Sequence, residues 1–216
     1  LPIYELSTTL KLADAANLTV GLFYTDFKNM LDQENIGKET IDNKQFDATK
    51  EINHGKVTAK GLEVLLNTAS FHGFRFTGGY TYTHAEIKEG AWSKRGGDWA
   101  NSPSKRPNEL PRHSLTARID YEWNDFSAYV KSVSKFDSEQ QNTKGGPNVD
   151  KYKNYTLVDL GASYVFKKQH RFSVAVNNIF DTGLEWVPSV TAGSYANAYK
   201  EYIDGRNFWF SYAYSF

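Results

Sequence analysis

The residue types that most often carry out chemistry are present in this chain, but they are not arranged for catalysis. There is no cysteine, so thiolate metal sites, disulfides and cysteine nucleophiles are all excluded. No acidic residues pair as a general acid and base, and no glycine loop of the kind that holds phosphate is present. The five histidines lack metal-ligand spacing; they are His54, His72, His84, His113 and His170. We therefore expect no enzyme activity, no metal site and no cofactor.

One polar stretch, from Lys88 to Pro111, combines cations with indole rings. Its candidate ligand-binding residues are Trp92, Lys94, Arg95, Trp99, Lys105 and Arg106. A second stretch nearer the C-terminus adds three phenols, Tyr195, Tyr199 and Tyr202. Guanidinium, ammonium and aromatic groups suit a ligand that carries both aromatic rings and negative charge. The alternative is that the aromatics mark a membrane–water boundary and the cations meet an anionic outer leaflet.

Composition limits the class of protein. The 216 residues include 25 basic and 25 acidic side chains, so charge offers no argument for binding nucleic acid. Aromatics make up 15% of the chain, and Tyr and Trp suit a membrane boundary because each has a polar group on an apolar body. No apolar stretch approaches the roughly 18 residues of a membrane-spanning helix. The chain begins at Leu1 without a targeting segment, so we expect a processed or partial chain.

The elements that must position these residues are strands. Period-two alternation predicts nine of them, over residues 2–12, 17–30, 52–69, 73–87, 112–123, 126–140, 154–167, 170–186 and 205–216. Short connections at 13–17, 71–73, 124–125 and 169–170 alternate with long polar ones near 31–51, 88–111, 141–153 and 187–204. Short turns at one end and long loops at the other are typical of an outer-membrane barrel.

The alternation itself separates an apolar face from a polar one. Within residues 112–123, Leu115, Ile119 and Trp123 share one face, while Arg118 and Asp120 lie on the other. The apolar face of the last six strands is free of charge, as a lipid-facing surface should be. Asp120 and Glu122 are expected to belong to a charge network on the inner face. Residues 17–30 are less regular, because Phe23 and Phe27 lie opposite Val20 and Leu22.

The last predicted strand has the clearest pattern, because aromatic rings occupy every second position up to the final residue. It resembles the sorting signal of outer-membrane barrels. The residues of this candidate sorting strand are Phe208, Phe210, Tyr212, Tyr214 and Phe216.

Four segments resemble the C-terminal barrel of TonB-dependent outer-membrane receptors. Residues 53–63 resemble the strand that carries a Gly-x-Glu after a polar lead-in. Residues 110–114 resemble the entry to a new strand through a Pro and a His, and residues 174–181 are similar to an Asn-Leu-Phe-Asp segment. Residues 205–216 look like the closing strand. The four occur in the family's order over about residues 50–216, and the catecholate-siderophore and colicin I receptor group looks closest.

The resemblance implies an all-β fold that is part of a large transmembrane antiparallel β-barrel. Residues 1–216 would form about nine C-terminal strands of a barrel of roughly 22 strands, whose lumen is plugged. The plug domain and the N-terminal strands have no counterpart here and are expected as partners. The strand count places Leu1 near the outer face and Phe216 on the periplasmic side.

The function that the resemblance implies is TonB-dependent uptake of a ferric siderophore, of catecholate type, through the outer membrane of a Gram-negative bacterium. Iron would enter only as part of the siderophore complex, and TonB would act through the plug. Outer-membrane lipid is a further expected partner, and a bacteriocin or phage could use the same surface. Haem, cobalamin or a sugar are alternative substrates. A passive porin, a barrel enzyme and a soluble β-rich binding module are the alternatives of other classes.

Overall fold

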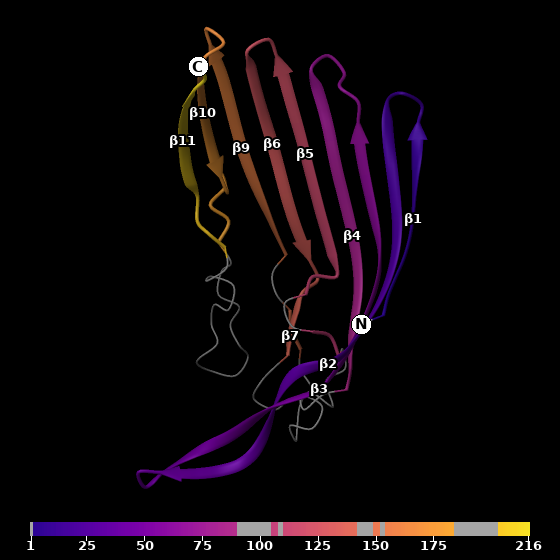
Figure 1. Ribbon diagram of the computed structural model, residues 1–216, viewed down its shortest axis with the longest axis vertical. Helices are drawn as coiled ribbons and strands as arrows, with labels where there is room; N and C mark the ends of the chain where they lie inside the picture. Colours follow the sequence, from indigo (N-terminus) through magenta and orange to yellow (C-terminus); the bar gives the residue numbers. More distant parts are fainter. Residues whose placement is uncertain (1, 90–104, 108–109, 142–148, 152–153, 184–202) are drawn as a thin grey trace.

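A computed structural model describes residues 2–89, 105–107, 110–141, 149–151, 154–183 and 203–216. These residues form strands and no helix, and nine strands make one antiparallel sheet in the order β1-β2-β3-β4-β5-β6-β9-β10-β11 (Figure 1). The bounds are β1 Ile3–Leu12, β2 Ala16–Ile41, β3 Lys44–Thr68, β4 Phe74–Glu89, β5 His113–Trp123, β6 Phe126–Phe136, β9 Tyr155–Phe166, β10 His170–Asn177 and β11 Asn207–Tyr214. A small hairpin pairs β7 (Glu139–Gln141) with β8 (Val149–Lys151).

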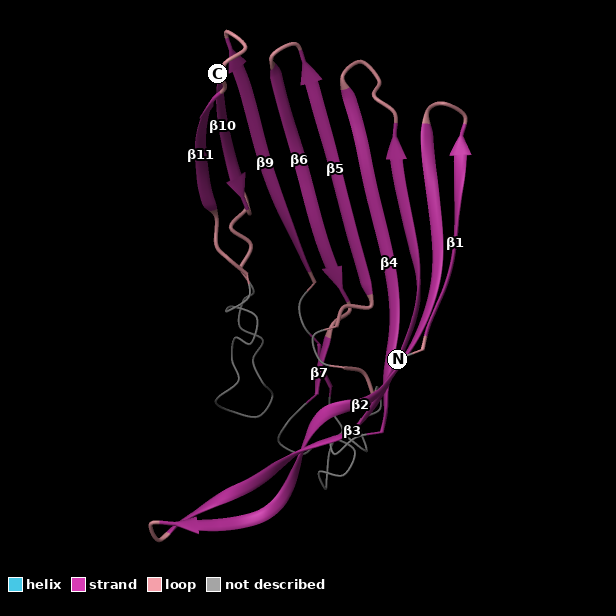
Figure 2. Cartoon of the chain, viewed as in Figure 1, coloured by secondary structure: helices cyan, strands magenta, loops and turns pink. Residues whose placement is uncertain are grey.

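The predicted count of nine strands in one sheet is confirmed. Every neighbouring pair is antiparallel, and the four short turns lie together at one end of the sheet (Figure 2). The chain enters β1 at the loop-bearing end and leaves β11 at the turn end, as expected from an odd number of strands (Figure 1). Among the described residues β1 and β11 each pair on one side only, so the sheet is not closed on itself.

The prediction of a long polar loop near residues 31–51 is wrong. β2 and β3 continue through this stretch as a paired ribbon that projects beyond the rest of the sheet (Figure 1). They turn at Asp42 and Asn43, whose φ angles of 48° and 62° are those of a two-residue hairpin turn. Periodicity missed the ribbon because the projecting part has polar residues on both faces, so there is no apolar side to alternate with.

Two other predicted boundaries also moved. β6 ends at Phe136, because Asp137 adopts a positive φ of 56° and breaks the strand before the β7–β8 hairpin. β10 ends at Asn177, because Asn178 turns the chain with a φ of 50°. Local turn conformations of this kind leave little trace in the apolar pattern on either side of them.

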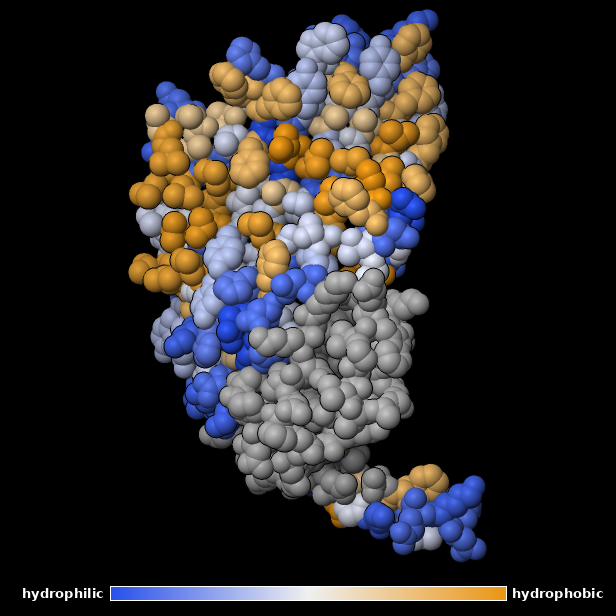
Figure 3. All heavy atoms as spheres, turned by 180° about the vertical axis from the view of Figure 1, so that it is seen from behind, coloured by the Kyte–Doolittle hydropathy of each residue, from blue (hydrophilic) through white to orange (hydrophobic). Residues whose placement is uncertain are grey.

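The sheet has almost no core of its own. Among the described residues, Ala85 is the only buried apolar side chain, while many large apolar side chains are exposed. In Figure 3 apolar residues gather over the strands away from the loop-bearing end, and hydrophilic residues gather toward that end. A water-soluble sheet would cover such a face with another layer. This one therefore requires an apolar medium or further protein against it.

Candidate functional site

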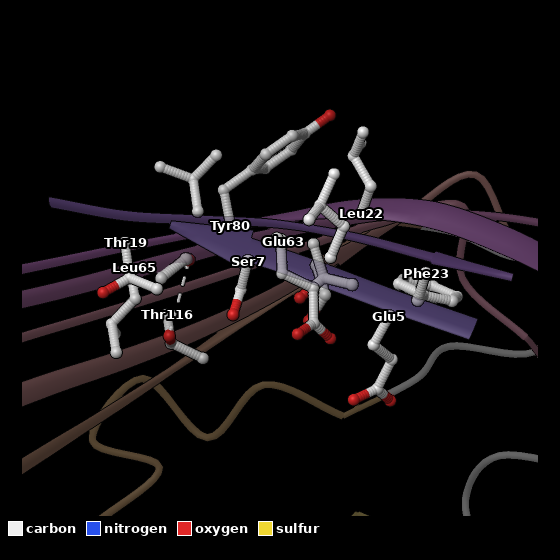
Figure 4. A pocket seen from close by; sticks show the side chains of 15 residues that line it. Glu5, Ser7, Thr19, Leu22, Phe23, Glu63, Leu65, Tyr80 and Thr116 are labelled. Carbon is white, nitrogen blue, oxygen red and sulfur yellow. Dashed lines mark hydrogen bonds between the residues drawn. The ribbon is translucent and has the colours of Figure 1, made fainter. Parts of the chain in front are cut away.

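Cross-strand register sorts the side chains of all nine strands onto two faces. One row joins Ile119, Val130, Leu160, Val176 and Phe208, and we call this the outer face. The row beside it joins Arg118, Lys131 and Asp159 and belongs to the inner face. Figure 4 shows the division directly, with Leu22 and Tyr80 on one side of the ribbon and Ser7, Glu63 and Thr116 on the other. The predicted separation into an apolar and a polar face is confirmed.

The height of the apolar band matches a membrane. On β4 the band runs from Phe74 to Tyr82, and on β5 from Leu115 to Trp123. Eight steps of about 3.4 Å give roughly 27 Å along a strand, which a tilt of about 40° reduces to about 21 Å. This is close to the apolar band of roughly 25 Å in outer-membrane barrels. The outer face thus has the dimensions of a lipid-facing surface.

Aromatic side chains lie at both edges of the band. At the loop end, the Tyr80 hydroxyl and His113 Nδ1 are hydrogen-bonded at 2.7 Å, with Tyr82 packed against the same ring. At the turn end, the Tyr212 hydroxyl and His170 Nδ1 are hydrogen-bonded at 2.9 Å. Each pair combines an apolar ring with a satisfied polar group, which is what the boundary between lipid and water favours.

The inner face carries a network of charges. Arg118 donates from Nε and Nη2 to the Asp120 carboxylate at 2.6–2.9 Å. The same guanidinium stacks over the Tyr129 ring, 4.3 Å from its centroid. The Tyr129 ring in turn lies across Gly161 of β9, where a Cβ would be 2.2 Å from it. The expectation that Asp120 belongs to an inner-face charge network is confirmed, and Glu122 lies on the same face.

A trough on the inner face of β1 to β5 is lined by Glu5, Ser7, Phe23, Glu63 and Thr116 (Figure 4). The irregularity of residues 17–30 is explained here, because Phe23 points inward and its ring covers Gly61 of β3. The two carboxylates form no ion pair with any described residue. This part of the inner face is therefore negative and suited to a cationic group.

The Asn-Asn-Ile-Phe-Asp segment at the end of β10 has a structural role. Asn178 is buried and its side-chain amide donates to the carbonyl oxygens of Thr182 and Asp204, while its Oδ1 accepts from the Thr182 amide. The backbone N–H of Asn178 donates to Asp159 Oδ1 at 2.9 Å. Asp181 accepts from the amide of Arg206, which leads into β11. These bonds fix the approach to the closing strand.

Arg106 lies at the base of the predicted ligand-binding loop, and its side chain is only 6% exposed. Its Nη1 is 2.8 Å from Glu139 Oε1 and 3.4 Å from Asp137 Oδ1, and its Nη2 donates to the Asp137 carbonyl. Arg112 adds a second cation, 3.2 Å from Asp137 Oδ2. We call these four residues the loop-base cluster. It joins the segment that enters β5 to the segment that leaves β6.

The structure therefore separates two neighbouring candidates. Lys105 is exposed, whereas the Arg106 guanidinium is engaged by carboxylates of this chain. Ligand contact by either residue stays a prediction. The remaining candidates lie outside the described residues; they are Trp92, Lys94, Arg95, Trp99, Tyr195, Tyr199 and Tyr202.

The candidate sorting strand is β11. Phe208, Phe210 and Tyr212 lie on the outer face opposite Val176, Val174 and Phe172 of β10. They are at least half exposed, and the edge of β11 away from β10 has no partner among the described residues. Its role in sorting stays a prediction.

Among the described residues there is no group of three or more His, Asp or Glu side chains that could hold a metal ion. No helix of the described part is long and apolar enough to cross a membrane.

Comparison with known families decides the assignment, because residues 4–179 match the family described as TonB dependent receptor-like, β-barrel. The chain belongs to this family. Its members are receptors, which supports the expectation that the chain is not an enzyme.

Relatives of this TonB-dependent receptor chain include the iron-regulated outer membrane virulence protein of Vibrio cholerae. The two are 26% identical over 200 residues, covering 90% of this chain and 27% of the relative. The catecholate siderophore receptor Fiu of Escherichia coli is 24% identical over 179 residues, covering 82% of this chain and 21% of Fiu. The chain thus spans about a quarter of the length of these relatives.

Solved structures show the same fold. The ferric enterobactin receptor PfeA of Pseudomonas aeruginosa superposes with a TM-score of 0.71 at 20% identity, covering 98% of this chain and 30% of PfeA. The siderophore receptor PirA of Acinetobacter baumannii gives 0.71 at 19% identity, covering 99% of this chain and 31% of PirA. The nine-stranded sheet is therefore part of a larger barrel.

Proposed function

We propose that this chain supplies nine C-terminal strands of an outer-membrane barrel that imports a ferric siderophore of the catecholate type. One observation carries the proposal: the outer face carries an apolar band that crosses all nine strands, while the inner face opposite the band is mostly polar and charged. That division suits lipid outside and a hydrated lumen inside. The names of the relatives Fiu and PfeA support the choice of substrate.

The remaining strands and the plug are proposed to come from the rest of the receptor. In a membrane every backbone N–H and C=O needs a partner, so the free edges of β1 and β11 must each pair with a further strand. The negative trough that contains Glu5 and Glu63 is available to a cationic group of the plug. Energy for transport would reach the receptor through TonB and that plug, and no bond in the siderophore is made or broken.

The test is uptake of radioactive iron by a strain in which the complete receptor is the sole route for ferric catecholates. We expect accumulation that requires an intact TonB, because transport against a gradient needs coupled energy. Equal uptake in a strain without TonB would show a passive pore. Uptake of haem in place of the ferric catecholate would leave the family assignment unchanged and would show that the proposed substrate is wrong.

Removing Phe216 is expected to lower assembly of the receptor into the outer membrane while synthesis continues. The physical reason is that the aromatic side chains of β11 lie on the outer face of a strand whose edge away from β10 has no partner among the described residues. Assembly is measured as the heat-resistant folded band on an unheated gel. Ala213→Ser on the inner face of the same strand is the control and should assemble normally. Normal assembly without Phe216 would contradict a sorting role.

A further inference from the structure

Two connections at the loop-bearing end of the sheet meet at Asp137, which turns the chain between β6 and the β7–β8 hairpin with a φ of 56°. Its carboxylate lies 3.4 Å from Arg106 Nη1 and 3.2 Å from Arg112 Nη1. Its carbonyl oxygen accepts from Arg106 Nη2 and from the backbone N–H of Arg112. Its own backbone N–H donates to Asn154 Oδ1 at 2.9 Å, immediately before β9. Asp137 therefore joins the segment that enters β5 to both ends of the connection between β6 and β9.

The segment that enters β5, described at residues 105–107 and 110–112, is called the entry segment below. On one side it is bound to β4, where the backbone N–H of Ile87 donates to its first described carbonyl oxygen at 2.8 Å. On the other side the Arg106 guanidinium lies 2.8 Å from Glu139 Oε1. Glu139 begins β7, which pairs with β8. Polar contacts thus run from β4 through the entry segment to the β7–β8 hairpin.

The four charges of the loop-base cluster depend on one another. The Arg106 and Glu139 side chains are 6% and 11% exposed, and those of Asp137 and Arg112 are 25% and 33% exposed. Two cations balance two carboxylates, so the loss of any one leaves a partly buried charge without full compensation. Such a loss costs more than the intact pair contributes to stability. The cluster is therefore expected to be either assembled or open, and the segments that it joins should open together.

We propose that Asp137 is a positioning residue that couples the connection between β4 and β5 to the connection between β6 and β9. A ferric siderophore held by one connection then also stabilises the other. This rests on the proposed function, which places both connections on the outer side, where the ligand is captured. Binding to either connection favours the assembled cluster, and the assembled cluster holds both connections in place. The coupling is reciprocal, as any coupling between two binding surfaces must be.

The experiment measures hydrogen exchange in the complete receptor, with and without a synthetic tris-catecholate chelate of iron(III). In the unmodified receptor we expect the entry segment and the β7–β8 hairpin to open with the same equilibrium constant. The chelate should protect both to the same extent. Asp137→Gly removes the carboxylate, and glycine adopts a φ of 56° without strain. The opening constants of the two segments should then differ by about tenfold, a typical coupling between two sites.

Iron uptake by the same variants separates positioning from a purely structural role. In Asp137→Gly the apparent KM should rise about tenfold at an unchanged maximal rate, because capture is altered and the later steps are not. Asp137→Asn should recover part of the affinity, since asparagine also adopts a positive φ and keeps an acceptor oxygen. The matched control is Asp42→Gly, which removes a carboxylate at a φ of 48° from the tip of the β2–β3 ribbon. It should leave exchange at the loop base and uptake unchanged.

The coupling is wrong if the two segments open independently in the unmodified receptor. It is also wrong if they still open together and gain equal protection in Asp137→Gly. Loss of protection throughout β5 and β6 in that variant would show a purely structural role and would overturn the proposal as well. The proposed function has a separate readout. If the unmodified receptor neither binds the chelate nor takes up its iron, the proposed function fails; if both are normal and the segments open independently, only the coupling fails.

Discussion

Replacing Arg106 with alanine is expected to open the base of the outer loop between β4 and β5. The Arg106 side chain is 6% exposed and has the Glu139 and Asp137 carboxylates within 4.0 Å. Removing the cation takes the ion-pair partner from the Glu139 carboxylate, whose side chain is 11% exposed, and leaves Asp137 paired with Arg112. Breaking a buried ion pair by removing one partner costs about 3–5 kcal/mol, and here that cost falls on the loop-base cluster. Hydrogen exchange at residues 105–106, 110–112 and 137–141 should show the loss of protection.

Lys105→Ala is the matched control, because it removes a neighbouring cation whose side chain is exposed. We expect its exchange to stay close to that of the unmodified receptor. Affinity for a ferric catecholate should fall in Arg106→Ala as a consequence of loop opening. If Arg106→Ala abolished ligand binding while exchange at the loop base stayed unchanged, Arg106 would be a direct ligand contact and the positioning role would be wrong.

Replacing Gly61 with alanine is expected to disrupt the pairing of β3 with β4, so that most receptor molecules fail to assemble. A Cβ at Gly61 would lie 2.0 Å from the carbonyl oxygen of Tyr82 and 2.5 Å from the Phe23 ring. The ring could move, but the carbonyl belongs to the neighbouring strand. Overpacking of about 3 kcal/mol and a lost strand hydrogen bond of about 1 kcal/mol give a total near 4 kcal/mol. The folded fraction on an unheated gel measures the effect.

The control for this change is Gly21→Ala on β2. A Cβ at Gly21 would meet nothing closer than Ser7 Cβ at 3.7 Å, which is ordinary contact. It should therefore assemble normally. Adding Phe23→Ala to Gly61→Ala is expected to recover only part of the folded fraction, because the Tyr82 carbonyl remains. Full assembly of Gly61→Ala by itself would show that the two strands can separate at little cost.

The strands were predictable wherever one face is apolar. In β5, β9 and β11 apolar and polar residues alternate, and this alternation determines which side chains meet lipid. The position, outward face and register of the strands could therefore be predicted from residues 115–123 and from Phe208 onward. The predicted turns were right for a related reason. Residues such as Asn124 and Lys167 adopt positive φ where two alternating runs are separated by only two or three residues.

The ribbon of β2 and β3 could not be predicted in this way. Its pairing from Met30 to Lys44 comes from backbone hydrogen bonds and the Asp42–Asn43 turn, and neither depends on an apolar face. The candidate site shows a similar limit. Lys105 and Arg106 are adjacent cations in the sequence, and only their packing shows that one is exposed and the other lies against Asp137 and Glu139. Burial of a charge depends on partners that are distant in sequence.

The most direct test of the account is the environment of successive side chains along β9. The chain has no cysteine, so single cysteines can be placed at six positions of β9, from Leu157 to Leu160 and at Ala162 and Ser163, in a complete receptor freed of any cysteine outside this chain. We predict that Val158, Leu160 and Ala162 react with a lipid-soluble maleimide in intact outer membranes. Leu157, Asp159 and Ser163 should react with a water-soluble one in the same membranes. Labelling of all six positions by the water-soluble reagent, or labelling without the period of two, would contradict a strand with lipid on one face and a hydrated lumen on the other.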